Sequence, residues 1–208
     1  MKNIAVYCGA STGNDEIYTL GAQKLGQWIV RNNYGLTYGG GRYGLMGVVA
    51  NSVLSANGFV HGIITQELAG RELSHAKLSK LDIVSDMSAR KQAMLTDSVA
   101  NIALPGGPGT LEEISEAFSW TIIGDSKNPC VFYNINHYYD DLESFFDAMT
   151  KHGFMEKETR KTLLFSDSLT EIGQFIKSYT PPKLRNYNKY PPNFIYSIVS
   201  QLIINSLI

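Results

Sequence analysis

The sequence predicts an α/β protein with a Rossmann-like, doubly wound parallel sheet of about seven strands and helices on both faces. Short, continuous apolar runs alternate along most of the chain with segments in which apolar residues recur at helical spacing. Glycine-rich turns follow several of these runs, as they do in nucleotide-binding sheets of this class. A length of 208 residues, with 44% apolar and 18% charged residues, is typical of one globular domain.

Continuous apolar runs predict strands, because strands of a parallel sheet are buried on both faces. In chain order these strands are expected at 4–8, 36–38, 60–64, 81–84, 100–104, 129–134 and 163–165. The segment 15–31 predicts a helix, since Ile17, Leu20, Leu25 and Ile29 recur near helical spacing. Similar patterns predict helices at 45–56, 88–98, 110–123, 140–151 and 169–178.

The charge balance and the cysteines argue against some classes of protein. Eighteen basic and 19 acidic residues give a formal charge of −1, so the chain lacks the basic footprint of a nucleic-acid binder. The first apolar run is too short for a signal peptide, so we expect a cytoplasmic protein. Cys8 and Cys130 lie too far apart for a metal-binding spacing and are expected to be reduced, buried thiols. Because Cys8 borders a candidate loop, a functional thiol is the alternative.

The chain changes character after residue 180. We expect a single nucleotide-binding domain at 1–180, then a Pro-containing linker and a C-terminal amphipathic helix within 181–208. In this tail the apolar residues at helical spacing are Phe194, Ile195, Ile198, Val199, Leu202 and Ile203. The run is too short to span a bilayer, which favours a helix docked on its own subunit or on a partner. Surface attachment to a membrane is the alternative, although the polar face lacks Lys and Arg.

The most informative turn is the glycine-rich segment 104–110, between the strand expected at 100–104 and the helix expected at 110–123. Backbone N–H groups of such a turn converge on an anion at the positive end of a helix. Gly106, Gly107, Gly109 and Thr110 are therefore candidate phosphate-binding residues, and Glu113 places an acid beside that phosphate. The alternative is a capping box, in which Thr110 caps the helix and Glu113 reaches back to it.

Two further turns follow predicted strands. In the first, Gly9 and Ser11 are candidate ligand contacts, with the hydroxyls of Ser11 and Thr12 as donors; the alternative is that these hydroxyls cap the next helix. The second turn, at 39–47, matches G-x-G-x-x-G.

The G-x-G-x-x-G match is a weak indication of NAD binding. It follows the second strand rather than the first, and no strand end places Glu67 as the ribose-binding acid. The turn, which includes Gly40 and Gly41, is instead expected to approach a ligand or another backbone closely. A packing turn without any ligand is the alternative.

Arg90 and Lys91 fall in the first turns of the helix expected at 88–98, where the helix dipole disfavours cations. Cations in this position indicate that they pair with a negatively charged group, and an anionic ligand is the first candidate for that group. The alternative is an exposed pair that points to solvent.

Together these residues resemble the LONELY GUY (LOG) family of cytokinin riboside 5′-monophosphate phosphoribohydrolases. The family pattern P-G-G-x-G-T-x-x-E is matched at residues 105–113, G-G-G-x-x-G-L-M-G at 39–47 and C-G-[SA]-S-x-G at 8–13. The resemblance covers about residues 1–180. It implies a Rossmann-like fold, usually dimeric, with sites near the subunit interface and without a metal or a redox cofactor.

The resemblance also implies roles for individual residues. Arg90 and Glu113 match the two catalytic positions. The nucleotide-binding positions are matched by Glu72, Lys91, the 107–113 turn and Ser119. Ser88 stands where the family usually has His, which bears on the choice of base more than on the reaction.

The expected reaction is hydrolysis of the N-glycosidic bond of a purine riboside 5′-monophosphate, with adenine or an N6-substituted, cytokinin-type adenine as the base. Glu113 would stabilise the oxocarbenium-like ribose that forms when the base departs. A non-catalytic sensor of AMP-like nucleotides is the alternative. Relatives of the family are often labelled lysine decarboxylases, but that chemistry needs pyridoxal phosphate on a lysine, and Lys91 is the only lysine near the proposed site.

Overall fold

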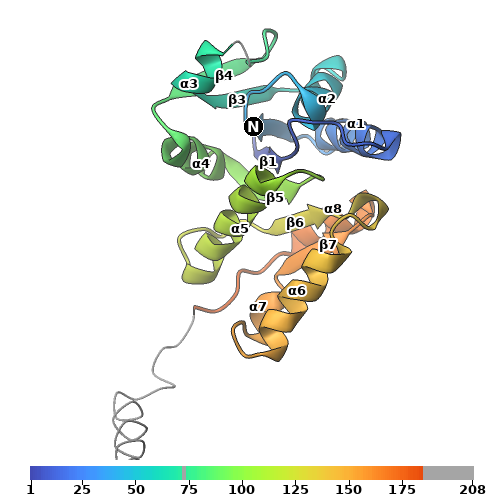
Figure 1. Cartoon of the computed structure of the whole chain (residues 1–208), viewed down its shortest axis with the longest axis vertical. Helices are drawn as coiled ribbons and strands as arrows, with labels where there is room; N and C mark the ends of the chain where they lie inside the picture. Colours follow the sequence, from blue (N-terminus) through green and yellow to red (C-terminus); the bar gives the residue numbers. More distant parts are fainter. Residues whose placement is uncertain (72–73, 185–208) are drawn as a thin grey trace, which may run out of the picture.

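Seven parallel strands form one sheet in the order β4-β3-β2-β1-β5-β6-β7 in the computed structural model, which describes residues 1–71 and 74–184 (Figure 1). The strands are β1 (Asn3–Tyr7), β2 (Gly35–Tyr38), β3 (Val60–Thr65), β4 (Lys80–Val84), β5 (Ser98–Ala103), β6 (Cys130–Tyr133) and β7 (Leu163–Ser166). Each agrees within two residues with a predicted strand, so the predicted α/β class is confirmed.

Six helices lie where apolar spacing predicts them: α1 (Glu16–Arg31), α2 (Gly44–Ser55), α4 (Met87–Thr96), α5 (Pro108–Ile123), α6 (Asp140–Lys151) and α8 (Leu169–Ser178). Three short elements were not predicted: α3 (Gln66–Gly70), η1 (Ile135–His137) and α7 (Lys157–Arg160). None of the three is long enough to show a repeating apolar pattern. The predicted C-terminal helix and the second part of the expected domain division lie outside the described residues, apart from 181–184.

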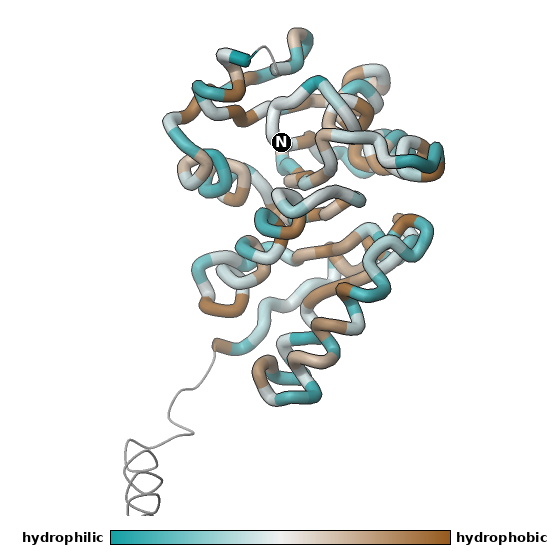
Figure 2. Tube along the Cα trace, viewed as in Figure 1, coloured by the Kyte–Doolittle hydropathy of each residue, from teal (hydrophilic) through white to brown (hydrophobic). Residues whose placement is uncertain are grey.

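The helices form two layers, one on each face of the sheet. Successive residues of β1 point to opposite faces: Ile4 and Val6 join a core with α1, α2 and α8, whereas Ala5 and Tyr7 join a core with α4, α5 and α6. Hydrophobic and hydrophilic residues accordingly alternate along the helices (Figure 2). Both faces of the sheet are therefore buried at its central strands, as their continuous apolar sequences require, whereas the edge strand β4 is partly exposed.

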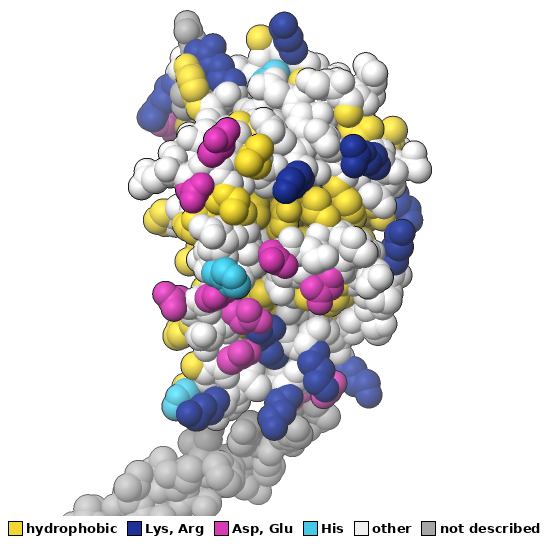
Figure 3. Space-filling model, turned by 90° about the vertical axis from the view of Figure 1, so that its right-hand side faces the viewer, with side chains coloured by type: hydrophobic (Ala, Val, Ile, Leu, Met, Phe, Trp, Pro, Cys, Tyr) yellow, Lys and Arg dark blue, Asp and Glu magenta, His cyan; other side chains and the backbone are white. Residues whose placement is uncertain are grey.

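The surface to the right of Figure 1 carries acidic and basic side chains in separate small groups, with hydrophobic side chains gathered across its middle (Figure 3). Within residues 1–71 and 74–184, no helix has the length and apolar character needed to cross a membrane.

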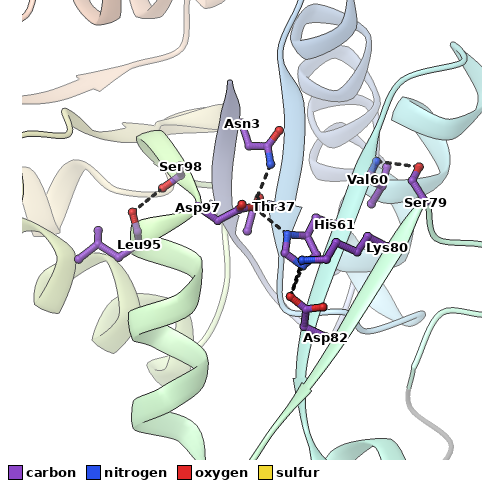
Figure 4. Close-up of polar contacts among 10 residues, drawn as sticks. All are labelled: Asn3, Thr37, Val60, His61, Ser79, Lys80, Asp82, Leu95, Asp97 and Ser98. Carbon is purple, nitrogen blue, oxygen red and sulfur yellow. Dashed lines mark hydrogen bonds and ion pairs between the residues drawn. The ribbon is translucent and has the colours of Figure 1, made fainter. Parts of the chain in front are cut away.

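A polar network ties the strands together near their amino-terminal ends (Figure 4). Asp97, which directly precedes β5, accepts hydrogen bonds from Asn3 Nδ2 (2.8 Å), His61 Nδ1 (2.8 Å) and Thr37 Oγ1. His61 Nε2 lies 2.8 Å from Asp82 Oδ2. The network thus links β1, β2, β3 and β4 to the start of β5 with charged hydrogen bonds, at the edge of the sheet opposite the glycine turns.

The Asp97 network predicts an acid-dependent part of the stability. Burial acts to raise the pKa of Asp97, but hydrogen bonds from Thr37, His61 and Asn3 outweigh it and lower the pKa below its ordinary value. Its stabilisation is therefore present above the unfolded pKa of about 4 and is lost as the pH falls through the lower, folded pKa. We expect Asp97→Asn to lower the free energy of unfolding by about 1 kcal/mol at pH 7.

Urea unfolding of both proteins from pH 7 to pH 3 measures this effect. The difference between them should begin to shrink below about pH 4, where the unfolded wild-type chain takes up a proton at Asp97, and it should vanish as the pH falls through the lower pKa of the folded protein. The exposed Asp125 offers a matched control, since Asp125→Asn should change the stability little at any pH. An equal loss of stability at pH 3 and at pH 7 for Asp97→Asn would contradict the assignment.

Candidate active site

The site forms where the strand order reverses, between β1 and β5. These strands pair directly, so the turns that follow them lie side by side at the carboxyl edge of the sheet. The N–H of Gly9 donates to the carbonyl of Pro105 at 3.1 Å, and a Cβ on Gly9 would lie 3.3 Å from Cα of Gly106. The first and third glycine turns are therefore in contact, and a crevice opens beside them.

A cavity of about 380 Å³ occupies this crevice. Its polar side chains are Arg90, Thr110, Glu112 and Glu113. Backbone of Gly9, Gly39, Gly41, Gly107 and Gly109 lines another part, and Cys8 and Ala10 also lie there. The apolar part consists of Met46, Ile64, Leu68 and Met87. All three predicted glycine turns and both expected catalytic residues thus meet in one cavity.

The helix α5 begins inside this cavity with an open amino end. Gly107 is its N-cap, Pro108 is its first residue, and no side chain among the described residues caps it. Cβ atoms placed on Gly107 or Gly109 would meet no protein atom within 4 Å, so packing does not require glycine at either position. Uncapped N–H groups and bare backbone at a helix start are the features of an anion site.

At position 106, in contrast, packing does require a glycine. A Cβ on Gly106 would lie 2.2 Å from Oγ1 of Thr110 and 2.8 Å from the backbone nitrogen of Gly9. The turn can approach β1 only if residue 106 lacks a side chain. Gly106 is therefore required by the fold, whereas Gly107 and Gly109 leave space for a ligand.

The capping-box alternative for Thr110 and Glu113 is wrong. The helix begins earlier than the sequence suggests, with Gly107 as its N-cap, so Thr110 is a buried residue of the first turn. The carboxylate of Glu113 does not turn back toward the helix start but contacts Arg90. Pro108 explains the shift, because proline is favoured at the first position of a helix.

Arg90 and Glu113 form a nearly buried ion pair. Nη1 of Arg90 lies 2.8 Å from Oε1 of Glu113, and the two side chains are only 8% and 10% exposed. Nε of Arg90 donates to the carbonyl of Ile63 at 3.0 Å, which holds the guanidinium in place. Burial raises the pKa of Glu113 above its ordinary value, and the nearby Arg90 charge opposes that rise. The pair sets a carboxylate of elevated pKa at the cavity wall.

Lys91 does not line the cavity that contains Arg90 and Glu113. Its ammonium group forms ion pairs with Glu112 and with Glu116, and the hydrogen bond to Glu112 is the main reason that its pKa is raised. The alternative of an exposed pair pointing to solvent is therefore wrong for both Arg90 and Lys91. No lysine of the described residues lines the cavity with Arg90 and Glu113, so this site does not fit pyridoxal phosphate bound to a lysine.

The second glycine turn serves packing and also lines the cavity. Gly40 adopts a positive φ of 74°, and its carbonyl accepts a hydrogen bond from the N–H of His75 at 2.9 Å. Gly44 also has a positive φ, of 58°, and a Cβ there would lie 2.2 Å from the carbonyl carbon of Ala10. Glu67 is exposed on α3 and pairs with Arg71, so nothing in this geometry supports the NAD interpretation.

The first glycine turn borders a second cavity, of about 360 Å³, that shares Gly9, Ala10 and Gly107 with the first. Ser11 and Thr12 line it together with Tyr18 and Tyr138. The expectation that Ser11 or Thr12 caps the next helix is wrong, because Asp15 caps α1. Ser11 Oγ instead accepts a hydrogen bond from the N–H of Gly13 at 3.3 Å.

Gly40, Lys91 and Ser119 were expected near the ligand, but none of them lines these two cavities. Ser119 is exposed on α5 and bonds to the carbonyl of Ser115 at 2.8 Å, and Ser88 is exposed in the first turn of α4. Glu72 lies outside the described residues. Burial raises the pKa of the Cys8 thiol, so it remains protonated and a poor nucleophile.

Relatives of known name match this chain over most of its length. It is 37% identical over 180 residues to the cytokinin riboside 5′-monophosphate phosphoribohydrolase LOG1 of Arabidopsis thaliana, covering 86% of this chain and 84% of the relative. LOG3 of the same plant, which carries the same activity name, is also 37% identical over 180 residues, with the same coverage. The chain belongs to the LOG family.

A family model described as "Possible lysine decarboxylase" matches residues 46–175 of this LOG family member. Among solved structures, a molybdenum cofactor binding protein from the phototrophic bacterium Rippkaea orientalis is similar, with a TM-score of 0.63 and 20% identity over 86% of this chain and 97% of that one. At this identity the similarity concerns the fold alone.

Two residues at the site of this LOG family member, Tyr138 and Tyr139, were not predicted from the sequence. Tyr138 donates its hydroxyl hydrogen to the carbonyl of Gly106 at 2.7 Å, and Tyr139 does the same to Leu104 at 2.7 Å. Both tyrosines follow β6, at the same carboxyl edge as the turn that they brace. Their position just after a strand was the available signal, but no pattern identified which residues there would turn inward.

The glycine at 109 permits a test of the anion site. Alanine favours a helix over glycine by about 1 kcal/mol, so Gly109→Ala should keep or slightly raise the thermal stability. It should also weaken AMP binding about tenfold, since its methyl group would enter the space beside the helix start. Calorimetric titration with AMP and thermal unfolding measure the two effects.

The matched variant is Gly106→Ala, which should lose stability as well as binding because its Cβ meets Thr110 and Gly9. Unchanged AMP affinity in Gly109→Ala would show that the ligand does not approach this turn.

Proposed function

We propose that this protein hydrolyses the N-glycosidic bond of a purine riboside 5′-monophosphate, releasing free adenine or an N6-substituted adenine and ribose 5-phosphate. The observation that carries the proposal is the buried Arg90–Glu113 pair in the same cavity as an uncapped, glycine-lined helix start. The named activity of the LOG relatives supports the same reaction.

The spacing along α5 suits such a substrate. Gly109 and Glu113 are four residues apart on one helix, which corresponds to an axial rise of about 6 Å. This is close to the span from the 5′-phosphate of a nucleotide to the anomeric carbon of its ribose. A phosphate bound by the N–H groups of the helix start would therefore set the anomeric carbon near the Glu113 carboxylate.

The base departs with the electron pair of the glycosidic bond and leaves positive charge on the ribose ring. The attacking water supplies the hydroxyl group of ribose 5-phosphate and, in balance, the proton that the free base carries. The ionised Glu113 carboxylate stabilises that charge, and it also orients and deprotonates the water that attacks the anomeric carbon. Arg90 favours the ionised form of Glu113 and fixes its orientation through their 2.8 Å contact. The rate should consequently fall as the pH drops through the pKa of Glu113, which burial raises above the ordinary value of a glutamate.

The base would lie against the apolar part of the cavity. Met46, Ile64, Leu68 and Met87 offer a surface suited to a purine ring and to an apolar N6 substituent. Ser88, beside Met87 in the chain, leaves this end without the imidazole that the family usually carries. The apolar wall therefore supports adenine-type bases in general rather than one particular substituent.

We also propose that the protein acts as a homodimer in the cytoplasm. Large apolar side chains are exposed on β4, α4 and α5: Ile83 (58%), Met87 (44%), Leu111 (39%) and Ile123 (57%). A second copy of the chain that covers these side chains would remove apolar surface from water. Light scattering on the purified protein measures whether its mass in solution is that of a dimer. The free cysteines Cys8 and Cys130 are compatible with a reducing compartment.

Product analysis tests the proposed reaction. Purified protein is incubated with AMP, with N6-isopentenyl-AMP and with the matching unphosphorylated nucleosides, and the free base is quantified by chromatography. We expect base release from the monophosphates only, because the helix start binds the phosphate. Release from nucleosides at equal rates would contradict the phosphate site. AMP binding without any base release would indicate the sensor function instead.

Removing the charge of Glu113 tests its role. Glu113→Gln keeps the shape of the side chain and much of its hydrogen bonding, but it cannot stabilise a positive charge. We expect turnover to fall by about 10²–10³-fold while AMP affinity stays within about threefold. Steady-state kinetics and calorimetry on the same preparation measure both quantities.

The exposed Glu158 on α7 pairs with Lys161 away from the site, so Glu158→Gln is a matched control that should keep full turnover. If Glu113→Gln also kept full turnover, Glu113 would have only a structural role.

A further inference from the structure

Gly39, the first residue of the glycine turn after β2, lies against the side chain of Arg90. A Cβ atom on Gly39 would lie 1.9 Å from Nη2 of Arg90 and 3.1 Å from its Cζ. Real Cβ contacts shorter than 3.0 Å essentially do not occur. The Arg90 guanidinium therefore occupies the space that a side chain at position 39 would need.

We propose that Gly39 is a positioning residue, which seats the Arg90 guanidinium against the Glu113 carboxylate. The inference rests on the proposed function, since it assigns the glycine turn of β2 a part in that reaction. The proposal also explains why the first residue of this turn is a glycine. Positive φ angles occur at Gly40 and Gly44 but not at Gly39, so the backbone conformation does not require glycine at position 39.

The guanidinium has little room to adjust. Its Nε is held by the Ile63 carbonyl at 3.0 Å, its Nη1 by Glu113 at 2.8 Å, and Met87 Sδ lies 3.8 Å from Nη1. The Arg90 side chain is 8% exposed, so it cannot simply swing into solvent. A methyl group at position 39 must therefore weaken the contact with Ile63, the contact with Glu113, or both.

The displacement would change how Glu113 titrates. Burial raises the pKa of this carboxyl, and the Arg90 charge is the largest influence that opposes it. Among the described residues, the other titratable groups around Glu113 are Lys91 on α4, Glu112 and Glu116 on α5, Tyr7 on β1, and Cys8 directly after β1. None of these takes the place of Arg90, so a displaced guanidinium leaves Glu113 protonated up to a higher pH.

The test compares Gly39→Ala with Gly58→Ala. A Cβ on Gly58 would lie 2.4 Å from Val30 Cγ2 and 2.6 Å from Val53 Cγ1, just before β3 and at the sheet edge opposite the site. Both variants crowd the interior, but only Gly39→Ala touches Arg90. We expect Gly39→Ala to lower kcat by about 10–100-fold, with a smaller change in KM, and to move the acid limb of the pH profile to higher pH. Gly58→Ala should lose thermal stability and keep the wild-type pH profile.

A double variant separates positioning from a general packing role and covers the case in which Gly39→Ala fails to fold. In the Arg90→Ala background the crowding atom is gone, so adding Gly39→Ala should lower turnover by less than about twofold and should leave the thermal stability of Arg90→Ala unchanged. A multiplicative loss in the double variant would overturn the inference. So would a wild-type pH profile in Gly39→Ala.

Nitrogen-15 NMR of the arginine side chains gives a readout that does not depend on catalysis. The Nε–H signal of Arg90, fixed by the Ile63 carbonyl, should shift in Gly39→Ala and stay in place in Gly58→Ala. If the wild-type protein released no base while this signal still shifted, the proposed reaction would be wrong and the seating of Arg90 by Gly39 would stand. An unshifted signal in Gly39→Ala would overturn the inference itself.

Discussion

Parallel pairing of β1 with β5 at the centre of the sheet is the constraint on which the site depends. Strands that leave this pair in opposite directions carry their helices to opposite faces, so a crevice opens at the carboxyl edge between them. The Gly9–Pro105 hydrogen bond then fixes how closely the two turns approach. The open amino end of α5 and the cavity beside it follow from that approach.

Electrostatics explains why Arg90 and Glu113 occur together. A buried carboxylate without a partner would take up a proton, and a buried guanidinium without a partner would cost several kcal/mol. Each side chain stabilises the charged form of the other in a cavity that has one apolar wall. The Arg90 charge also reduces the repulsion between the Glu113 carboxylate and an anion bound in the same cavity.

Much of the fold was predictable because the sheet is buried on both faces. Strands of this kind appear as continuous apolar runs, and six helices show long apolar periods. The start of α5 was misplaced, since Thr110–Glu113 satisfies a local capping pattern that Pro108 and the contact with Arg90 override. Short elements such as α3 and α7 hold too few residues to show a period.

By itself, the sequence determined the α/β class, the positions of three glycine turns after strands, and the candidate pair Arg90 and Glu113, because residue type and local spacing carry that information. Only the tertiary structure decided which glycine does what. Gly106 makes room for β1, Gly107 and Gly109 leave space open, and Gly39 makes room for Arg90. Gly39 makes room for a side chain more than 50 residues further along the chain, and Gly106 approaches Gly9, which lies more than 50 residues before it. No local sequence pattern records such contacts.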